Sequence, residues 1–258
     1  MEGHTKCRDW ILEEITKSCE NVRKQEFTHK WSKGQDLKMW NLIGEQNYAK
    51  AKTRILLIAH WDTRPTADQD PNEANHAEPI LGANDGASGV AVLLELMRTL
   101  KDKLPKDTGV MYLMTDGEDV GPSLQEMFLG AKHFAKNMPD PKPDYGILID
   151  MVGDKDLRVP VEPNSFRFAP KLIYALYDHA RSIGLADTFP LVEGPWIEDD
   201  HICLNNAGLK TIDLIDFEYP EWHTVKDLPD RCSADSLEKV GRLLQTWVQK
   251  DPAFIIGG

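Results

Sequence analysis

The sequence lacks any hydrophobic run long enough to cross a bilayer. Its longest apolar stretches, such as residues 55–59, are a quarter of the roughly 20 residues that a membrane-spanning helix needs. The first seven residues also lack the apolar core of a signal peptide. We expect no membrane span. We expect a periplasmic or secreted protein whose leader lies outside this sequence, with a cytoplasmic protein as the alternative.

Cysteine is scarce and is not arranged in pairs. The four cysteines are Cys7, Cys19, Cys203 and Cys232, and they form neither a CxxC pair nor a zinc-finger spacing. If Cys7 and Cys19 share one straight helix, they lie about 18 Å apart, too far for a disulfide. The sequence therefore predicts no disulfide framework.

An excess of positive charge is also missing. Lysine and arginine total 30 against 42 aspartate and glutamate residues, a formal net charge of −12. This balance argues against nucleic acid or an anionic membrane surface as the main partner. There is no internal repeat, low-complexity tract or long linker among the 258 residues. We expect one domain over residues 1–258, and a monomer.

The hydrophobic pattern that is present alternates between strands and helices. Nearly continuous apolar runs predict buried strands, whereas apolar residues at helical spacing predict helices. The strands are expected at residues 54–59, 109–115, 145–151 and 211–215, with a half-exposed strand at 37–43. The helices are expected at residues 87–100, 125–136, 170–182 and 233–249. This order predicts an α/β domain with a mixed, mostly parallel, twisted central sheet and helices on both faces. An N-terminal helical segment, with its helix at residues 8–25 and within residues 1–30, should pack on it, and residues 66–79 should form a surface loop.

Acidic residues follow the predicted strands. Glu118 and Asp119 come directly after one buried strand, and Asp62 and Asp150 come at the ends of two others. Two neighbouring carboxylates at such a place repel each other unless a cation or a proton separates them. Ligands collect outside the carboxyl ends of strands in open α/β sheets. Asp85, Asp119 and His223 together form a ligand set typical of zinc with one open position.

Five motifs in order carry a resemblance to a known family. They are His60-Trp61-Asp62, residues 82–89 around Asp85, residues 116–119, Asp150, and Trp222-His223. In this order they resemble the zinc-dependent aminopeptidase superfamily, peptidase family M28, and imply its zinc aminopeptidase-like fold. Residues 196–202 and Trp222 are similar to the glutaminyl cyclases within that superfamily, and residues 60–65 to their bacterial, animal-type branch. Those enzymes use one zinc ion to convert N-terminal glutamine to pyroglutamate, with release of ammonia.

The resemblance implies a role for each residue. One Zn²⁺ per chain would be held by Asp85, Asp119 and His223, with Asp119 in place of the usual glutamate. Glu118 would be the general acid and base, and Asp150 and Asp199 would be buried acids that share its protons. Trp222, Trp196 and Tyr219 would line the substrate pocket, and His60, Asp62 and His201 would surround the site, His201 as a buried histidine rather than a ligand. The implied partners are peptides or proteins with an N-terminal glutamine.

Two other interpretations stay open. An M28 aminopeptidase would hold two zinc ions, and His60 and Asp150 are chemically able to bind the second. Residues 198–201 and Trp222 favour the cyclase, and we expect a hydrogen bond from Asp199 to hold Asp150 away from the metal. A noncatalytic binding domain on the same scaffold is the third interpretation, although such proteins usually lose a ligand or the acid/base, and none is missing here.

Overall fold

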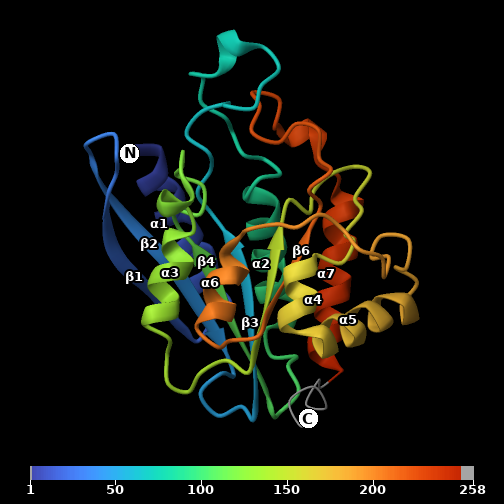
Figure 1. The fold of residues 1–258 in the computed structure, drawn as a ribbon. Helices are drawn as coiled ribbons and strands as arrows, with labels where there is room; N and C mark the ends of the chain where they lie inside the picture. The colour runs from blue at the N-terminus through green and yellow to red at the C-terminus, as the bar shows by residue number, and fades with distance from the viewer. Residues whose placement is uncertain (1, 251–258) are drawn as a thin grey trace.

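The computed structural model describes residues 2–250, and its centre is one six-stranded mixed sheet (Figure 1). The spatial order is β1-β2-β4-β3-β5-β6. β1 and β2 run antiparallel to their neighbours, whereas β4, β3, β5 and β6 are parallel to one another. The strands are β1 (Asn21–Lys30), β2 (Asp36–Gln46), β3 (Thr53–His60), β4 (Thr108–Thr115), β5 (Tyr145–Asp150) and β6 (Thr211–Ile215). The predicted mixed, mostly parallel α/β sheet is confirmed.

Helices cover both faces of this sheet. They are α1 (Glu2–Thr16), α2 (Ala87–Leu100), α3 (Leu129–Lys136), α4 (Pro163–Phe168), α5 (Pro170–Ser182), α6 (Asp200–Asn206) and α7 (Ala234–Gln249). In Figure 1, α3, α6 and α4 lie in front of the sheet, and α1, α2 and α7 lie behind it. Three short 3-10 helices interrupt the loops at Glu73–Asn75, Leu124–Glu126 and Pro229–Arg231.

The alternation of side chains along the central strands explains the two layers of core. Ile55 and Leu57 of β3 pack into the cluster that includes α1, α2 and α7. Leu56 and Ile58 point to the opposite face, where their cluster includes Phe134 of α3. Because successive side chains of a strand face opposite sides, a strand buried on both faces needs the continuous apolar run that the sequence contains.

The N-terminal segment differs from the prediction. The helix ends at Thr16, and residues 21–30, expected to belong to a helical segment, form the edge strand β1. β2 is buried from Met39 onward rather than half-exposed, because α1 and α3 both contact it. The helix predicted at residues 125–136 begins later than expected, at Leu129, after Phe128 adopts a left-handed conformation. Two short helices, α4 and α6, were not predicted.

The topology brings distant loops together at one edge of the sheet. The loops after β3, β4, β5 and β6 all leave from the carboxyl ends of parallel strands. Figure 1 shows the long loop after β3 and the loop after β6 side by side at the top of the molecule. Gln69 of the first donates its N–H to the carbonyl of His223 in the second, 3.3 Å away.

All four cysteines are free, and no helix in residues 2–250 could cross a membrane.

Candidate active site

Asp85, Asp119 and His223 converge at this edge of the sheet. One ligand atom from each lies within 4.8 Å of the others, and all three residues are buried. His223 Nε2 lies 3.0 Å from Asp119 Oδ2 and 3.4 Å from Asp85 Oδ2. Within the described residues, Asp119 Oδ2 accepts no hydrogen bond. Two carboxylates and an imidazole nitrogen aimed at one point are the donor set that zinc prefers, so these residues fit the predicted metal.

Asp227 positions the loop that carries Asp85. Its carboxylate accepts the N–H of Asn84 at 2.8 Å and the N–H of Asp85 at 3.1 Å. The hydroxyl of Tyr219 donates to the same carboxylate at 2.9 Å. The Asp227 side chain is fully buried, so this bond network fixes the backbone at a metal ligand. Sequence analysis missed Asp227, since one acid four residues after His223 carries no distinctive pattern.

Asp62 has the same function for the turn after β4. Its two carboxylate oxygens accept the N–H groups of Glu118 and Asp119, each at 3.1 Å. One residue that follows β3 therefore sets the backbone of both acids that follow the neighbouring strand β4. The structure places Asp62 beside the site, as the sequence predicts.

Two further residues support the ligands from the loop after β3. His223 Nδ1 lies 3.2 Å from Asp68 Oδ1, an arrangement that directs Nε2 toward Asp85 and Asp119. Arg64 donates to Asp119 Oδ1 at 3.0 Å and also to Asp68. Arg64 lies within the motif of residues 60–65 but was given no role of its own. Asp68 was not singled out, because residues 66–79 carry only the composition of a surface loop. That loop instead contributes a direct partner of His223.

The loop after Asp119 is held from outside by the turn between β1 and β2. Trp31 donates its indole N–H to the carbonyl of Gly121 at 2.8 Å. Ser32 donates its backbone N–H and its hydroxyl to the carboxylate of Glu126, at 2.6 and 2.8 Å. The unpredicted hairpin therefore anchors the segment between Asp119 and the cavity residue Met127.

His60 lies between Asp85 and Asp150. Its Nε2 is 3.1 Å from Asp85 Oδ1 and 3.1 Å from Asp150 Oδ1, and these three residues form a second group that could hold a metal ion. A Cβ on Gly86 would lie 2.5 Å from the His60 ring, so this position requires glycine. Burial alone would lower the pKa of His60, but Asp150, Asp62 and Asp85 outweigh it and raise that pKa.

Glu118, Asp150 and Asp199 are buried carboxyl groups around one cavity. Burial, with Asp119 next to it, raises the pKa of Glu118 well above its ordinary value. Burial and the nearby Asp150 raise the pKa of Asp199 in the same way. Within residues 2–250, Asp199 Oδ2 has no hydrogen-bond partner. The expected hydrogen bond from Asp199 to Asp150 is not among the contacts of these residues; Asp150 Oδ1 instead contacts His60 and accepts the N–H of Met151.

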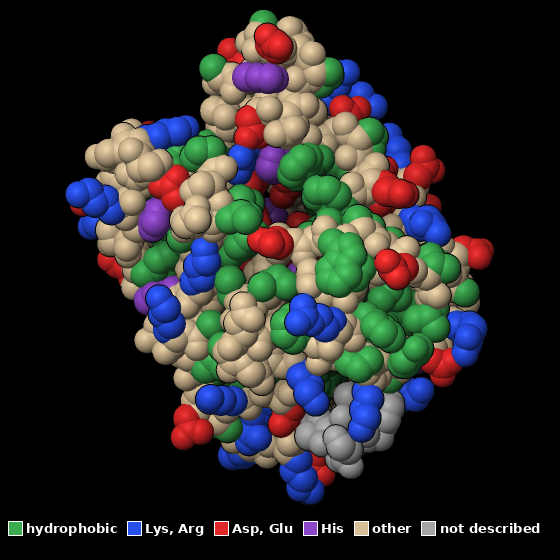
Figure 2. Space-filling view, in the orientation of Figure 1, with side chains coloured by type: hydrophobic (Ala, Val, Ile, Leu, Met, Phe, Trp, Pro, Cys, Tyr) green, Lys and Arg blue, Asp and Glu red, His purple; other side chains and the backbone are tan. Residues whose placement is uncertain are grey.

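The cavity at these residues is small, about 60 Å³. Its walls are Asp85, Glu118, Asp119, Met127, Asp150, Met151, Ile197, Glu198, Asp199, Ile215, Phe217, Trp222 and His223. Trp222 stacks on His223, with ring centroids 3.9 Å apart and an interplanar angle of 24°. Figure 2 shows a hollow on this face with acidic and histidine side chains at its base.

Two of the residues predicted to line the substrate pocket, Trp196 and Tyr219, are not among the walls of this cavity. Trp196 is 64% exposed, and Tyr219 is buried with its hydroxyl on Asp227, so neither lines the wall as expected. His201 is fully buried behind Asp199, with Nε2 3.2 Å from Glu162 Oε2 and Nδ1 3.7 Å from Asp213 Oδ2. His201 is thus a core residue next to the site.

Comparison with known proteins agrees with this geometry. A glutaminyl cyclase from Bacteroides thetaiotaomicron, solved with N-acetylhistamine, is 35% identical with a TM-score of 0.92, over 97% of this chain and 91% of that one. A structure described as a leucine aminopeptidase precursor from the same species is 34% identical with a TM-score of 0.93, over 97% and 90%. Bovine glutaminyl-peptide cyclotransferase is 26% identical over 242 residues, 81% of this chain, and the chain spans 65% of the length of that relative.

The family assignment rests on most of the chain. Peptidase family M28 matches residues 41–248, which include the second half of β2, the strands β3 to β6, and the candidate ligands Asp85, Asp119 and His223. The chain therefore belongs to peptidase family M28.

Proposed function

We propose that this protein is a glutaminyl-peptide cyclotransferase, which converts the N-terminal glutamine of peptides or proteins to pyroglutamate and releases ammonia. The observation that carries the proposal is the likeness to a solved glutaminyl cyclase over 97% of the chain. The arrangement of Trp222 against His223, beside a small cavity with Glu118 in its wall, is consistent with it.

One Zn²⁺ would be held by Asp85, Asp119 and His223. When bound, it supplies a Lewis acid for the γ-carboxamide carbonyl of the substrate. The protein holds these ligands through Asp227, Asp62 and Asp68, which contact the backbone or the ring of a ligand. The site is therefore built around rigid supports rather than around free side chains.

Glu118 would move the proton. The substrate's α-amine attacks the γ-carboxamide carbon, a C–N bond forms, and the bond to the departing nitrogen breaks. Glu118 accepts the proton that the amine loses and delivers it to the leaving ammonia, so no water and no net proton are consumed. A carboxyl group serves this purpose when its pKa lies near neutrality, and burial beside Asp119 raises the pKa of Glu118.

The small cavity supports a substrate that reacts with itself. Ring closure joins the side-chain carboxamide carbon to the α-amine of the same residue. Because the two reacting groups are already linked, little entropy remains to be lost at the site. A volume of about 60 Å³ accommodates one short side chain and leaves the rest of a peptide outside. This geometry favours recognition of an N-terminal residue.

A two-zinc aminopeptidase is the second candidate. It is supported by the group of His60, Asp85 and Asp150, whose ligand atoms lie within 4.8 Å of one another. In that case Asp85, which belongs to both groups, would help to hold each ion, and Glu118 would activate water instead of taking a proton from an amine.

One experiment separates the two functions. The zinc-loaded protein is incubated with a glutaminyl dipeptide and, in parallel, with a leucine aminopeptidase substrate. Ammonia with a pyroglutamyl product, no leucine release, and one zinc per chain by elemental analysis are the expected results. Leucine release without ammonia, with two zinc ions per chain, would establish the aminopeptidase instead.

A further inference from the structure

Exposed hydrophobic side chains gather on one part of the surface. Within residues 2–250, five of the eight large hydrophobic residues that are exposed belong to α4, α5 and residues 191–196. We name them the apolar face: Phe166, Tyr174, Leu191, Val192 and Trp196. In Figure 2, hydrophobic side chains spread from beside the hollow across the region over α4 and α5. A concentration of this kind marks an interaction surface rather than scattered exposure.

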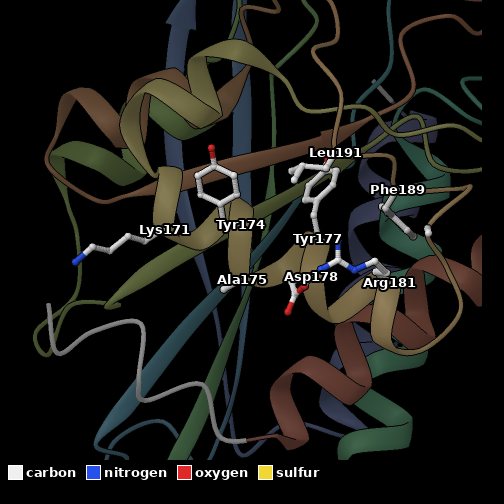
Figure 3. A pocket seen from close by; sticks show the side chains of 9 residues that line it. Lys171, Tyr174, Ala175, Tyr177, Asp178, Arg181, Phe189 and Leu191 are labelled. Carbon is white, nitrogen blue, oxygen red and sulfur yellow. Dashed lines mark hydrogen bonds and ion pairs between the residues drawn. The ribbon is translucent and has the colours of Figure 1, made fainter.

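The far end of the apolar face contains a groove of about 570 Å³. Its apolar walls come from Tyr174, Tyr177, Phe189 and Leu191. Figure 3 shows Tyr177, Phe189 and Leu191 at one end of the groove, with Tyr174 and Lys171 at the other. The groove is large enough for one or two aliphatic or aromatic side chains.

The apolar face continues into the candidate active site. Trp196 directly precedes Ile197 and Glu198, which line the cavity. Asn164 of α4 donates to the carbonyl of Ile197 at 3.1 Å. Two residues further along α4, Phe166 contacts Tyr174 of the groove, with ring centroids 5.5 Å apart. Chain continuity and these contacts therefore connect the cavity wall to the groove wall.

The length of this path is limited by the backbone. Six residues separate Ile197 in the cavity wall from Leu191 in the groove wall. A fully extended chain spans at most about 3.5 Å per residue, so the path is no longer than about 21 Å. A peptide whose first residue lies in the cavity therefore reaches the groove no later than about its seventh residue.

We propose that the apolar face binds the downstream part of the peptide substrate, with an apolar side chain from within its first seven or so residues seated in the groove. This inference rests on the proposed function, because the cavity must hold the N-terminal glutamine. The occupant is an extended apolar peptide segment, since the cavity leaves room for little more than the first side chain and the adjoining surface is apolar.

The test compares two octapeptides that begin with glutamine and carry either leucine or serine at positions three to eight. Burial of a leucine side chain in the groove should raise kcat/KM, measured by ammonia release, about tenfold over the serine peptide. Leu191→Ser should reduce this ratio to about one and leave kcat/KM for a glutaminyl dipeptide unchanged. Trp10→Ser, at an exposed residue of α1, is the matched control and should keep the wild-type ratio.

Three results would overturn the inference: equal kcat/KM for both octapeptides, a leucine preference that survives Leu191→Ser, or a dimer in sedimentation analysis that Leu191→Ser converts to a monomer. The last result would make a second copy of the chain the occupant. Fluorescence anisotropy with C-terminally labelled octapeptides measures the ratio of the two peptides' dissociation constants and does not depend on turnover. If no glutaminyl substrate releases ammonia, the proposed function fails, and the anisotropy ratio still decides whether the face binds peptide.

Discussion

The substitution Asp227→Asn tests how strongly the protein positions a metal ligand through its backbone. Asp227 Oδ1 accepts hydrogen bonds from Asn84 N–H and Tyr219 hydroxyl, whereas Oδ2 accepts only the N–H of Asp85. An asparagine can keep the first two bonds with its carbonyl oxygen. Its NH₂ group then faces the N–H of Asp85, donor against donor, in a fully buried place.

The expected cost follows from that single broken bond. A hydrogen bond to a charged group contributes about 1.5–3 kcal/mol, and a buried donor without a partner costs a similar amount. Burial raises the pKa of Asp227, which means that its buried charge is unfavourable. Loss of this charge in Asp227→Asn therefore offsets part of the cost of the lost hydrogen bond. We expect Asp227→Asn to lower the free energy of unfolding by about 2–3 kcal/mol and zinc affinity by about 10–100-fold.

Tyr219→Phe is the matched control, because it removes one donor to Asp227 and leaves the bond to Asp85 intact. It should cost about 1 kcal/mol of stability with zinc affinity nearly unchanged. Urea unfolding in the presence of a chelator measures stability, and competition with a chromophoric chelator measures zinc affinity. The reasoning is refuted if Asp227→Asn binds zinc as tightly as the wild type, or if both variants lose the same affinity.

Two further predictions concern the proposed metal site, and a third concerns Asp216, a buried residue directly after β6. Glu118→Gln should lower kcat by about 10²–10⁴-fold with bound zinc unchanged; loss of zinc in this variant would mean that Glu118, not Asp119, is the ligand. Removal of zinc with a chelator should lower the free energy of unfolding by about 4 kcal/mol relative to zinc at 1,000 times its dissociation constant, and an unchanged unfolding midpoint would contradict the assigned site. Burial raises the pKa of Asp216 to about 6, above its value in the unfolded chain. The stability of the wild type relative to Asp216→Asn should therefore be highest below about pH 4 and fall by roughly 1–3 kcal/mol as pH rises through 6. A pH-independent difference in urea unfolding would refute this.

The ligands share one principle of support. A separate carboxylate contacts each of them: Asp227 at the backbone of Asp85, Asp62 at the backbone of Asp119, and Asp68 at the ring of His223. Each support comes from a different loop than its ligand. Correct folding of the loops after β3 and β6 would therefore be a condition for metal binding at the proposed ligands, and a bound metal would in turn stabilise these loops.

Much of the fold was predictable because hydrophobic runs report burial directly. The four parallel strands carry continuous apolar runs, and the structure confirms them as β3, β4, β5 and β6 within one or two residues. β1 escaped prediction because its burial pattern alternates between exposed and half-buried positions, and polar residues dominate an edge strand. Likewise α4 and α6, of six and seven residues, are too short to show a helical period.

The sequence by itself determined which side chains could perform the chemistry, because acids and a histidine after buried strands must meet at the carboxyl edge of a parallel sheet. The resemblance to peptidase family M28 then singled out Asp85, Asp119 and His223 as the candidate ligands, and the structure brings the three together. Only the tertiary structure decided which other groups reach them. Asp227 and Asp68 contact ligands across loops, and Tyr219 and Trp196 lie outside the cavity that was expected to contain them. The physical reason is that loop conformation depends on long-range hydrogen bonds, which leave no periodic pattern in the residues that make them.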